Sequence, residues 1–156
     1  MLKPINSENY KKIREWRNLP EVRSMMFTKH IISKEEHDAW WERVSGDPTQ
    51  RWFMFAHNGT DLGVVCFIDI DNAIKAASWG FYLADDELFS SHQVSKRRVW
   101  LDLEKEAIDF AQHVLGLRAL FCEVLEENKA VIKLHERSGF EEITHTHTHT
   151  HRAYAV

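Results

Sequence analysis

Glu123 and His135 are the two side chains of this sequence whose types and positions best suit proton transfer. Glu123 interrupts the apolar run from Leu120 to Leu125, and a core strand does not normally carry a carboxylate. His135 lies in the amphipathic segment that follows, and imidazole is the side chain that titrates closest to neutral pH. Such a pair can accept and donate protons in a reaction. The alternative is a core strand packed on a helix, in which hydrogen bonds satisfy both groups.

A buried strand, a sharp turn and one short helix are predicted within residues 121–140, and they position these two groups. Asn128 is suited to cap the start of the helix, and Gly139 stands where a left-handed C-cap is expected. At 100° per residue, Asn128 and His135 lie two turns apart on one face, which they share with apolar residues. That face is predicted to lie beside the strand that bears a buried acid.

The length and composition predict a single domain, residues 1–156, whose core needs neither disulfides nor metal. The formal net charge of −4 is mild and argues against an extended surface for nucleic acid. Cys66 and Cys122 lie in apolar, strand-like runs and are interpreted as buried thiols, which suits a reducing compartment. No apolar stretch approaches the length of a membrane span, and the N-terminus lacks the apolar region of a signal peptide. We therefore expect a cytoplasmic protein.

Three short helices are predicted in residues 1–50. They cover residues 7–18, residues 21–26 and the stretch from Ser33 to Gly46, and Ser33 with Glu36 forms a capping-box pattern. The region is rich in aromatic, methionine and arginine side chains. Such side chains either fill a core or line a cleft.

Residues 51–140 are predicted to form the sheet. Two apolar runs, residues 51–57 and 62–71, flank Asn58-Gly59, which is a strong hairpin signal. The next strand, residues 76–83, contains Gly80, and an interior glycine marks a bulge or a close approach of the backbone. A long helix follows, with apolar residues at helical spacing: Trp100, Leu103, Ala107, Phe110, Ala111 and Val114.

The strand–Asn–helix unit resembles the C-terminal half of the GNAT superfamily of acyl-CoA N-acyltransferases. Members carry Leu-Tyr followed shortly by Gly-Phe, and this chain has Leu134-His135 followed by Gly139-Phe140. The resemblance covers most of the chain and implies an α/β (α+β) GNAT fold, with a central mixed, mainly antiparallel sheet of about six strands flanked by helices. It also implies acetyl-CoA as co-substrate, with residues 1–50 on the substrate side and residues 51–140 forming the sheet and the coenzyme half. Many members pair, so a homodimer is among the expectations.

The resemblance implies that one strand and the start of the following helix contact the coenzyme. In the family, a glycine-rich loop at this helix start holds the pyrophosphate. This chain has no glycine between Gly80 and Gly116, so we interpret the segment as replaced or lengthened. Either the cations of residues 96–98 stand in as phosphate contacts, or they are solvated and the coenzyme site is lost. The residues implied to bind coenzyme are Phe81, Leu83, Ser90, Ser91, Arg97, Arg98 and Asn128.

Within the superfamily, the chain resembles the N-acetyltransferases of pseudaminic acid biosynthesis. The residues that carry this resemblance are Trp16 to Asn18 with Pro20, Met26-Phe27, Ile32-Ser33 with His37 and Trp40, Trp79 to Tyr82, and Glu123-Val124. The resemblance implies acetylation of the 4-amino group of UDP-4-amino-4,6-dideoxy-N-acetyl-β-L-altrosamine, a precursor of flagellin glycans. The residues implied to bind this sugar nucleotide are Arg17, Met26, Phe27, His37, Trp40 and Tyr82.

The mechanism implied by the resemblance is direct attack of the amine on the thioester. We expect Glu123 to accept the proton of the amine, and backbone amides around Gly80 to stabilise the oxyanion. We expect His135 to protonate the departing sulfur, the role that tyrosine has in the family.

Two other functions remain open. The Rim-type ribosomal-protein N-terminal acetyltransferases share the opening pattern of Trp-Arg-Asn followed by Pro-Glu-Val-Arg, so a peptide acceptor is one alternative. A catalytically degenerate fold that binds only sugar nucleotide or metal is the other.

A His-Thr repeat occupies residues 144–151. As a strand, it places His145, His147, His149 and His151 on one face. Alternating histidines bind divalent metals adventitiously, although we expect no metal in catalysis. The repeat also fits slippage of a DNA repeat, which would leave the last strand of the sheet missing or altered.

Overall fold

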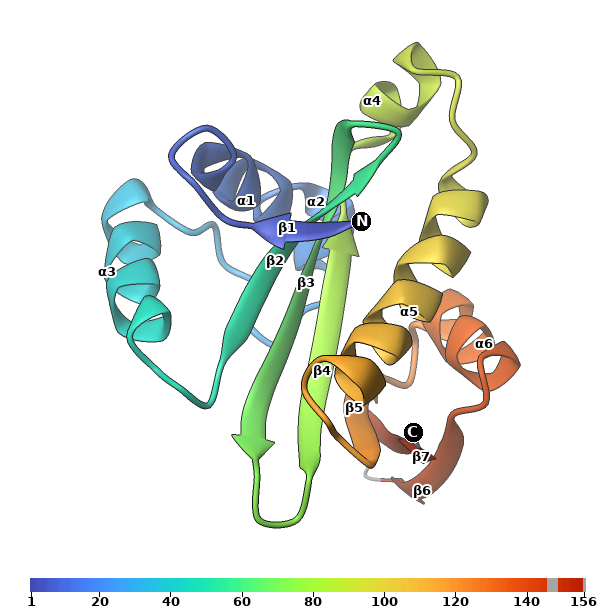
Figure 1. Cartoon of the computed structure of the whole chain (residues 1–156). Helices are drawn as coiled ribbons and strands as arrows, with labels where there is room; N and C mark the ends of the chain where they lie inside the picture. The colour runs from blue at the N-terminus through green and yellow to red at the C-terminus, as the bar shows by residue number, and fades with distance from the viewer. Residues whose placement is uncertain (146–148, 156) are drawn as a thin grey trace.

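The computed structural model describes residues 1–145 and 149–155 (Figure 1). In these residues the elements follow the order β1 (Leu2–Pro4), α1 (Tyr10–Arg17), α2 (Pro20–Arg23), α3 (Lys34–Ser45), β2 (Arg51–His57), β3 (Thr60–Asp71), β4 (Ala76–Leu83), α4 (Asp86–Ser91), α5 (Lys96–His113), β5 (Ala119–Leu125), α6 (Lys129–Arg137), β6 (Glu141–His145) and β7 (His149–Ala155). The strands form one sheet in the order β1-β2-β3-β4-β5-β7-β6. Neighbouring strands are antiparallel, except that β4 and β5 are parallel. No helix in the described part is long and apolar enough to cross a membrane.

The β2–β3 hairpin confirms the turn predicted at Asn58-Gly59. Both residues have positive φ, 50° at Asn58 and 80° at Gly59. This conformation is the one that a tight hairpin turn requires, and Asn and Gly adopt it at low cost. The hairpin aligns Phe53 with Val65 and Met54 with Val64, so apolar side chains of both strands enter the core together.

The core lies on both faces of the central strands. On one face, Phe110 of α5 packs edge-on against Phe53 at 4.8 Å between ring centroids and stacks on Phe67 at 5.7 Å. α1 packs on the other face of the sheet. Its Ile13 side chain is buried, and the carbonyl of Ile13 accepts a 3.5 Å hydrogen bond from the hydroxyl of Tyr82 in β4. The sheet therefore separates α1 from α5.

The mainly antiparallel sheet with flanking helices confirms the predicted fold class. The sheet has one strand more than the six or so expected, because Leu2–Pro4 pairs with β2 at the edge. The last strand, which the His-Thr repeat put in doubt, is present: β7 pairs with β5 on one side and β6 on the other. Its alternating pattern suits a strand whatever its origin.

Helix boundaries differ from the predicted ones in the N-terminal region. α1 begins at Tyr10 rather than near Ser7, because the Asn6 side chain accepts hydrogen bonds from the backbone of Glu8 and Asn9 and holds a turn there. α2 ends at Arg23, short of the predicted residue 26. The Ser33 cap of α3 is confirmed, since its side chain accepts a 3.1 Å hydrogen bond from the Glu36 amide.

β4 and β5 pair over only three residues each. Ala76, Ala77 and Ser78 are aligned with Ala119, Leu120 and Phe121, and both strands continue beyond this point without pairing to one another. From Trp79 onward, β3 is the only strand neighbour of β4 among residues 1–145 and 149–155, while β5 pairs with β7 (Figure 1). The sheet thus opens between its two parallel strands.

Candidate functional site

A buried carboxylate–imidazole pair joins α5 and α6. Oε1 of Glu104 lies 2.6 Å from Nδ1 of His135, and the two residues have 0% and 2% of their surface exposed. Glu104 is on the inner face of α5, and His135 is on the inner face of α6 with Ile132 and Leu134. A carboxylate only accepts hydrogen bonds, so the imidazole donates from Nδ1.

Glu104 was missed in the sequence, although a signal existed. It interrupts the apolar face of α5, where Val99, Leu103, Ala107 and Ala111 are buried. A fully buried glutamate is rare unless it is paired. A charged residue in the apolar stripe of a predicted helix therefore indicates a buried group that has a partner.

His135 lies among aromatic rings that come from β4 and from Phe140, which precedes β6. Its ring centroid is 5.5 Å from Trp79, 6.2 Å from Phe81 and 5.2 Å from Phe140. Trp79 and Phe81 belong to the part of β4 that no longer pairs with β5. His135, predicted as catalytic, therefore contacts the two residues on either side of Gly80, a predicted catalytic residue on β4.

Trp100 lies at the same place, with its ring 5.8 Å from Phe81. The indole Nε1 of Trp100, the indole Nε1 of Trp79 and Oε2 of Glu104 are buried polar atoms without a hydrogen-bond partner in the described part of the chain. A buried polar group without a partner costs stability, and such groups concentrate at functional sites. The opening is therefore both aromatic and incompletely satisfied.

The prediction that Glu123 is a buried acid is wrong. Cys122 and Val124 are buried, whereas Glu123 is exposed, because alternate residues of a strand point to opposite faces. The apolar run suggested that both faces of the strand are buried, but at Glu123 only the face of β5 that bears Cys122 and Val124 packs on the core. Glu123 aligns with His151 of β7, and its role as proton acceptor stays a prediction.

Both ends of α6 lie where the sequence predicted them, but the predicted capping hydrogen bond at its start is missing. Asn128 occupies the N-cap position, but its side chain makes no capping hydrogen bond. Gly139 has a φ of 103°, as the expected left-handed ending requires.

Gly80 lies in a regular part of β4. Pairing with β3 stays in register from Leu83 to Ser78, and the irregularity lies between Ile68 and Asp71 instead. Of the two expectations for Gly80, the bulge is wrong. A side chain there would meet only the sulfur of Cys66, at 3.6 Å.

The segment between β4 and α5 confirms that the expected glycine-rich loop is replaced. It contains the extra helix α4 and then Gln93, which has a φ of 54° in the left-handed region that glycine usually fills. Ser90 and Ser91, predicted to bind coenzyme, are exposed residues of α4 rather than of the start of α5.

The first turn of α5 carries the predicted phosphate-binding cations. Ser95 caps the helix by accepting a 3.2 Å hydrogen bond from the Arg98 amide. Lys96 pairs with Asp86 at 2.7 Å, and Nε of Arg98 lies 3.5 Å from Asp102. Arg97 is exposed and has no ion pair within the described residues. Two other predicted coenzyme residues lie in different surroundings: Phe81 is at the opening between β4 and β5, and Leu83 is buried in the core.

Arg17 lies on the other face of the sheet. Its Nη2 donates a 2.7 Å hydrogen bond to the carbonyl of Thr28, while Nη1 is buried without a partner among the described residues. Burial lowers the pKa of Arg17, and the negative charge that Tyr82 and Glu36 can carry acts against this. Burial likewise raises the pKa of Tyr82. These two predicted substrate residues are near one another.

The remaining predicted substrate residues differ in how far their side chains are buried. His37 is 5% exposed and sits in an aromatic cluster, 4.5 Å from Tyr10 and 5.3 Å from Trp40 between ring centroids. Burial lowers the pKa of His37. Met26 is half-buried and Phe27 is exposed, in the turn after α2. All of these substrate roles stay predictions.

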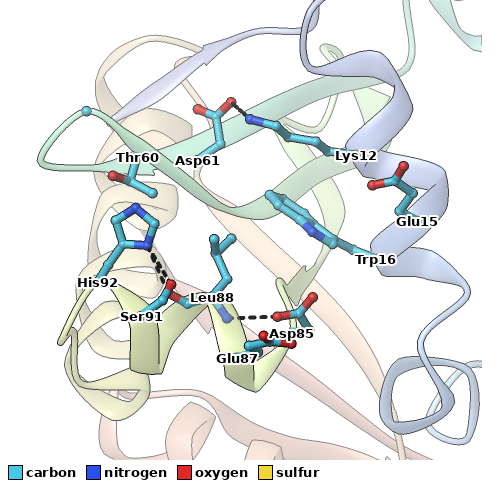
Figure 2. A pocket seen from close by; sticks show the side chains of 11 residues that line it. Lys12, Glu15, Trp16, Thr60, Asp61, Asp85, Glu87, Leu88, Ser91 and His92 are labelled. Atoms are coloured by element: carbon cyan, nitrogen blue, oxygen red, sulfur yellow. Dashed lines mark hydrogen bonds and ion pairs between the residues drawn. The ribbon is translucent and has the colours of Figure 1, made fainter.

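An open pocket of about 590 Å³ lies between α1, the β2–β3 turn and α4 (Figure 2). Its carboxylates are largely engaged: Asp61 pairs with Lys3 at 2.7 Å and Lys12 at 3.2 Å, and Asp85 caps α4. Of the predicted site residues, only Ser91 lines it. The pocket is therefore separate from the acid–base site.

The histidines of the repeat cannot be placed as ligands. His147 lies outside the described residues, and the side chains of His145, His149 and His151 are not described either. Within the described part, no three His, Cys, Asp or Glu side chains are grouped as a metal site would require.

Comparison with known families gives one match over most of the chain. The model described as acetyltransferase (GNAT) domain matches residues 1–141. Among curated proteins, acetyltransferase PseH from two strains of Campylobacter jejuni is 27% and 29% identical over 136 residues, which is 87% of this chain and 79% of each relative.

Solved structures share the fold at lower identity. Spermidine N-acetyltransferase from Vibrio cholerae, in complex with CoA and spermine, superposes with a TM-score of 0.86 at 18% identity, over 99% of this chain and 94% of that one. PseH from Campylobacter jejuni, in complex with acetyl coenzyme A, gives a TM-score of 0.75 at 20% identity, over 99% and 97%.

Proposed function

Because the chain belongs to the GNAT acetyltransferase family, we propose that it acetylates the 4-amino group of a UDP-linked amino-deoxy sugar in pseudaminic acid biosynthesis. It is an N-acetyltransferase that uses acetyl-CoA as co-substrate. We also propose that residues 1–156 form a single domain. The acceptor is supported by the two PseH relatives, which match the chain over most of its length.

The observation that carries the proposal is the opening between β4 and β5 with His135 beside it. Past Ser78 and Phe121 the two parallel strands no longer pair, so within the described part of the chain the edge of β4 toward β5 has no strand neighbour from Trp79 to Leu83. An extended ligand can bind such an edge through main-chain hydrogen bonds, as a strand would. The pantetheine arm of coenzyme A is extended and carries amides, so it fits this edge.

The start of α5 fits the pyrophosphate of the coenzyme. The first amides of a helix attract anions, and three successive cations at this end are unfavourable for the helix unless an anion lies near. Lys96 and Arg98 already have carboxylate neighbours, which leaves Arg97 as the cation best able to contact a phosphate.

Arg17 supports a diphosphate-bearing acceptor. Its guanidinium holds one buried nitrogen without a partner in the described residues, beside the hydroxyl-bearing ring of Tyr82. Burying a charged donor unpaired is costly, and an anionic ligand removes that cost. Arg17 lies on the α1 side of the sheet, opposite α5 and α6, so acceptor and coenzyme approach from different sides.

We propose the following roles in the transfer. Acetyl-CoA supplies an activated acetyl group. Glu123, exposed on β5, accepts the proton of the amine directly or through water, and His135 gives a proton to the departing sulfur. Backbone amides around Gly80 stabilise the negative charge on the carbonyl oxygen.

An acceptor panel tests the proposal. Purified protein and acetyl-CoA are incubated separately with the UDP-4-amino sugar, spermidine and a ribosomal-protein N-terminal peptide, and thiol release is measured. We expect release with the sugar nucleotide only. Release with spermidine or the peptide alone would overturn the proposed acceptor.

A thermal-shift series tests coenzyme binding separately. A ligand that binds the native state raises the melting temperature by mass action. We expect acetyl-CoA and UDP each to raise it. A response to UDP but not to acetyl-CoA would indicate a degenerate fold that binds only the nucleotide.

A further inference from the structure

We propose that Glu104 is the positioning residue for His135: its carboxylate holds the Nδ1 proton and so directs the Nε2 nitrogen to the departing sulfur. The inference rests on the proposed function, because it concerns how His135 acts in acetyl transfer. It assigns a role to a residue that the sequence did not single out.

The geometry of the pair fixes the state of the ring. Nδ1 is 2.6 Å from Oε1 of Glu104, a short hydrogen bond, and hydrogen bonds that involve a charged group are the shorter ones. Because the carboxylate only accepts, Nδ1 keeps its proton in the neutral and in the charged ring alike. The proton that can be gained and lost is therefore on Nε2.

A purely structural role explains the pair less well. Joining α5 to α6 by an ion pair is expensive, because both charges lose water and an apolar contact of similar volume often does as well. Here Oε2 of Glu104 also has no partner, and the indole nitrogens of Trp79 and Trp100 have none among the described residues. Incomplete satisfaction at the sheet opening points to a site kept for chemistry.

The charged groups around the pair come from four elements. Glu104 is on α5, Glu136 is on α6 itself, and Arg152 of β7 pairs with Glu136 at 3.1 Å. Cys122 of β5 is close enough to Glu104 for the carboxylate to raise the pKa of its thiol, together with burial. Glu104 is thus the anion in direct contact with the imidazole.

The proton balance requires a charged ring before transfer. The reaction forms a C–N bond and breaks the C–S bond; the amine loses a proton and the sulfur gains one. His135 gives its Nε2 proton to the sulfur and becomes neutral, keeping Nδ1–H on Glu104. The proton lost by the amine passes through Glu123 to water, and His135 takes a new proton from solvent. The carboxylate of Glu104 stabilises the charged ring that must exist before the transfer.

A double-mutant cycle tests the proposal. Glu104→Gln keeps the shape and an acceptor oxygen but removes the charge, and we expect it to lower kcat about 10- to 100-fold with little change in KM for acetyl-CoA. His135→Tyr replaces the imidazole with a phenol, and we expect Glu104→Gln to add no further loss of kcat in that background. Equal losses in both backgrounds, or no loss in either, would overturn the proposal.

A second readout does not depend on the acceptor. The ¹⁵N shifts of the His135 ring report which nitrogen carries the proton, and we expect Nδ1 to be protonated in the wild type at every pH of the titration. A wild-type ring protonated only on Nε2 would overturn the proposal even where the acceptor panel succeeds. The expected shifts with no acetylation of any acceptor would instead count against the proposed function.

Discussion

Ser78 of β4 and Phe121 of β5 form the last aligned pair before these two parallel strands part. Every residue of β4 beyond Ser78 keeps β3 on one side and, among the residues that the structure describes, has no strand on the other. Parallel strands in a sheet are normally buried and continuous, so an early separation leaves main-chain groups for a ligand. His135 and its partner Glu104 lie beside that separation.

Two glycines of the sheet, Gly63 and Gly80, should differ in how far a change to alanine lowers the free energy of unfolding. In Gly63→Ala, the new Cβ would lie 3.1 Å from both Leu103 and the carbonyl of Tyr82, so we expect a loss of about 1–3 kcal/mol in the free energy of unfolding. In Gly80→Ala, the Cβ would lie 3.6 Å from the Cys66 sulfur, an ordinary contact. We expect that variant to unfold like the wild type in urea. A stable Gly63→Ala would contradict the close packing of α5 on β3.

The two helix caps of Ser33 and Asn128 should contribute unequally. Ser33 accepts a hydrogen bond from the Glu36 amide, so we expect Ser33→Ala to cost about 1 kcal/mol. Asn128 makes no capping bond, so we expect Asn128→Ala to cost less. Chemical denaturation of both variants measures the difference. Equal losses would show that Asn128 caps α6 in solution.

The Cys122 thiol should resist modification in the native protein. Burial raises its pKa to about 12 from 9.0, with the Glu104 carboxylate adding to the effect and Arg152 opposing it. Because the thiolate is the reactive form, we expect slow labelling by a disulfide reagent at about pH 8 and fast labelling in denaturant. Cys122→Ser identifies which thiol reacts. Fast native labelling of Cys122 would contradict its burial.

The same thiol predicts how stability changes at alkaline pH. The folded pKa lies above the unfolded value, so its contribution is fully present below about pH 9. It decreases as pH rises toward about 12, because the unfolded chain then releases the proton more readily. Comparing wild type with Cys122→Ser in urea at about pH 8 and pH 10 isolates this contribution. A difference that grows with pH would have the wrong sign.

Arg17 should affect the acceptor and not the coenzyme. We expect Arg17→Met to raise KM for the sugar nucleotide about tenfold, because a charged hydrogen bond to phosphate is lost, and to leave KM for acetyl-CoA unchanged. Arg14→Met, on the same helix, is the matched control and should change neither. A change in KM for acetyl-CoA alone would place Arg17 in the coenzyme site.

The local patterns that the sequence predicted correctly are those that depend on neighbouring residues. Asn58-Gly59 is compatible with positive φ and therefore determines the hairpin. Ser33 determines the start of α3, and the apolar spacing from Trp100 to Ala111 determines the inner face of α5. Hydrogen-bonding capacity and side-chain period are properties of a short segment, so the sequence alone contains them.

Tertiary structure decided burial and pairing. The same period that predicts β5 cannot say which face is covered, and Glu123 proved to be exposed. Nor can it say where β4 and β5 stop pairing, because that depends on strands distant in the chain. The sequence by itself determined that Glu104 and His135 lie on amphipathic helices. Only the packing of α5 against α6 brought the carboxylate within 2.6 Å of the ring, since contact between distant segments is set by how their surfaces fit together.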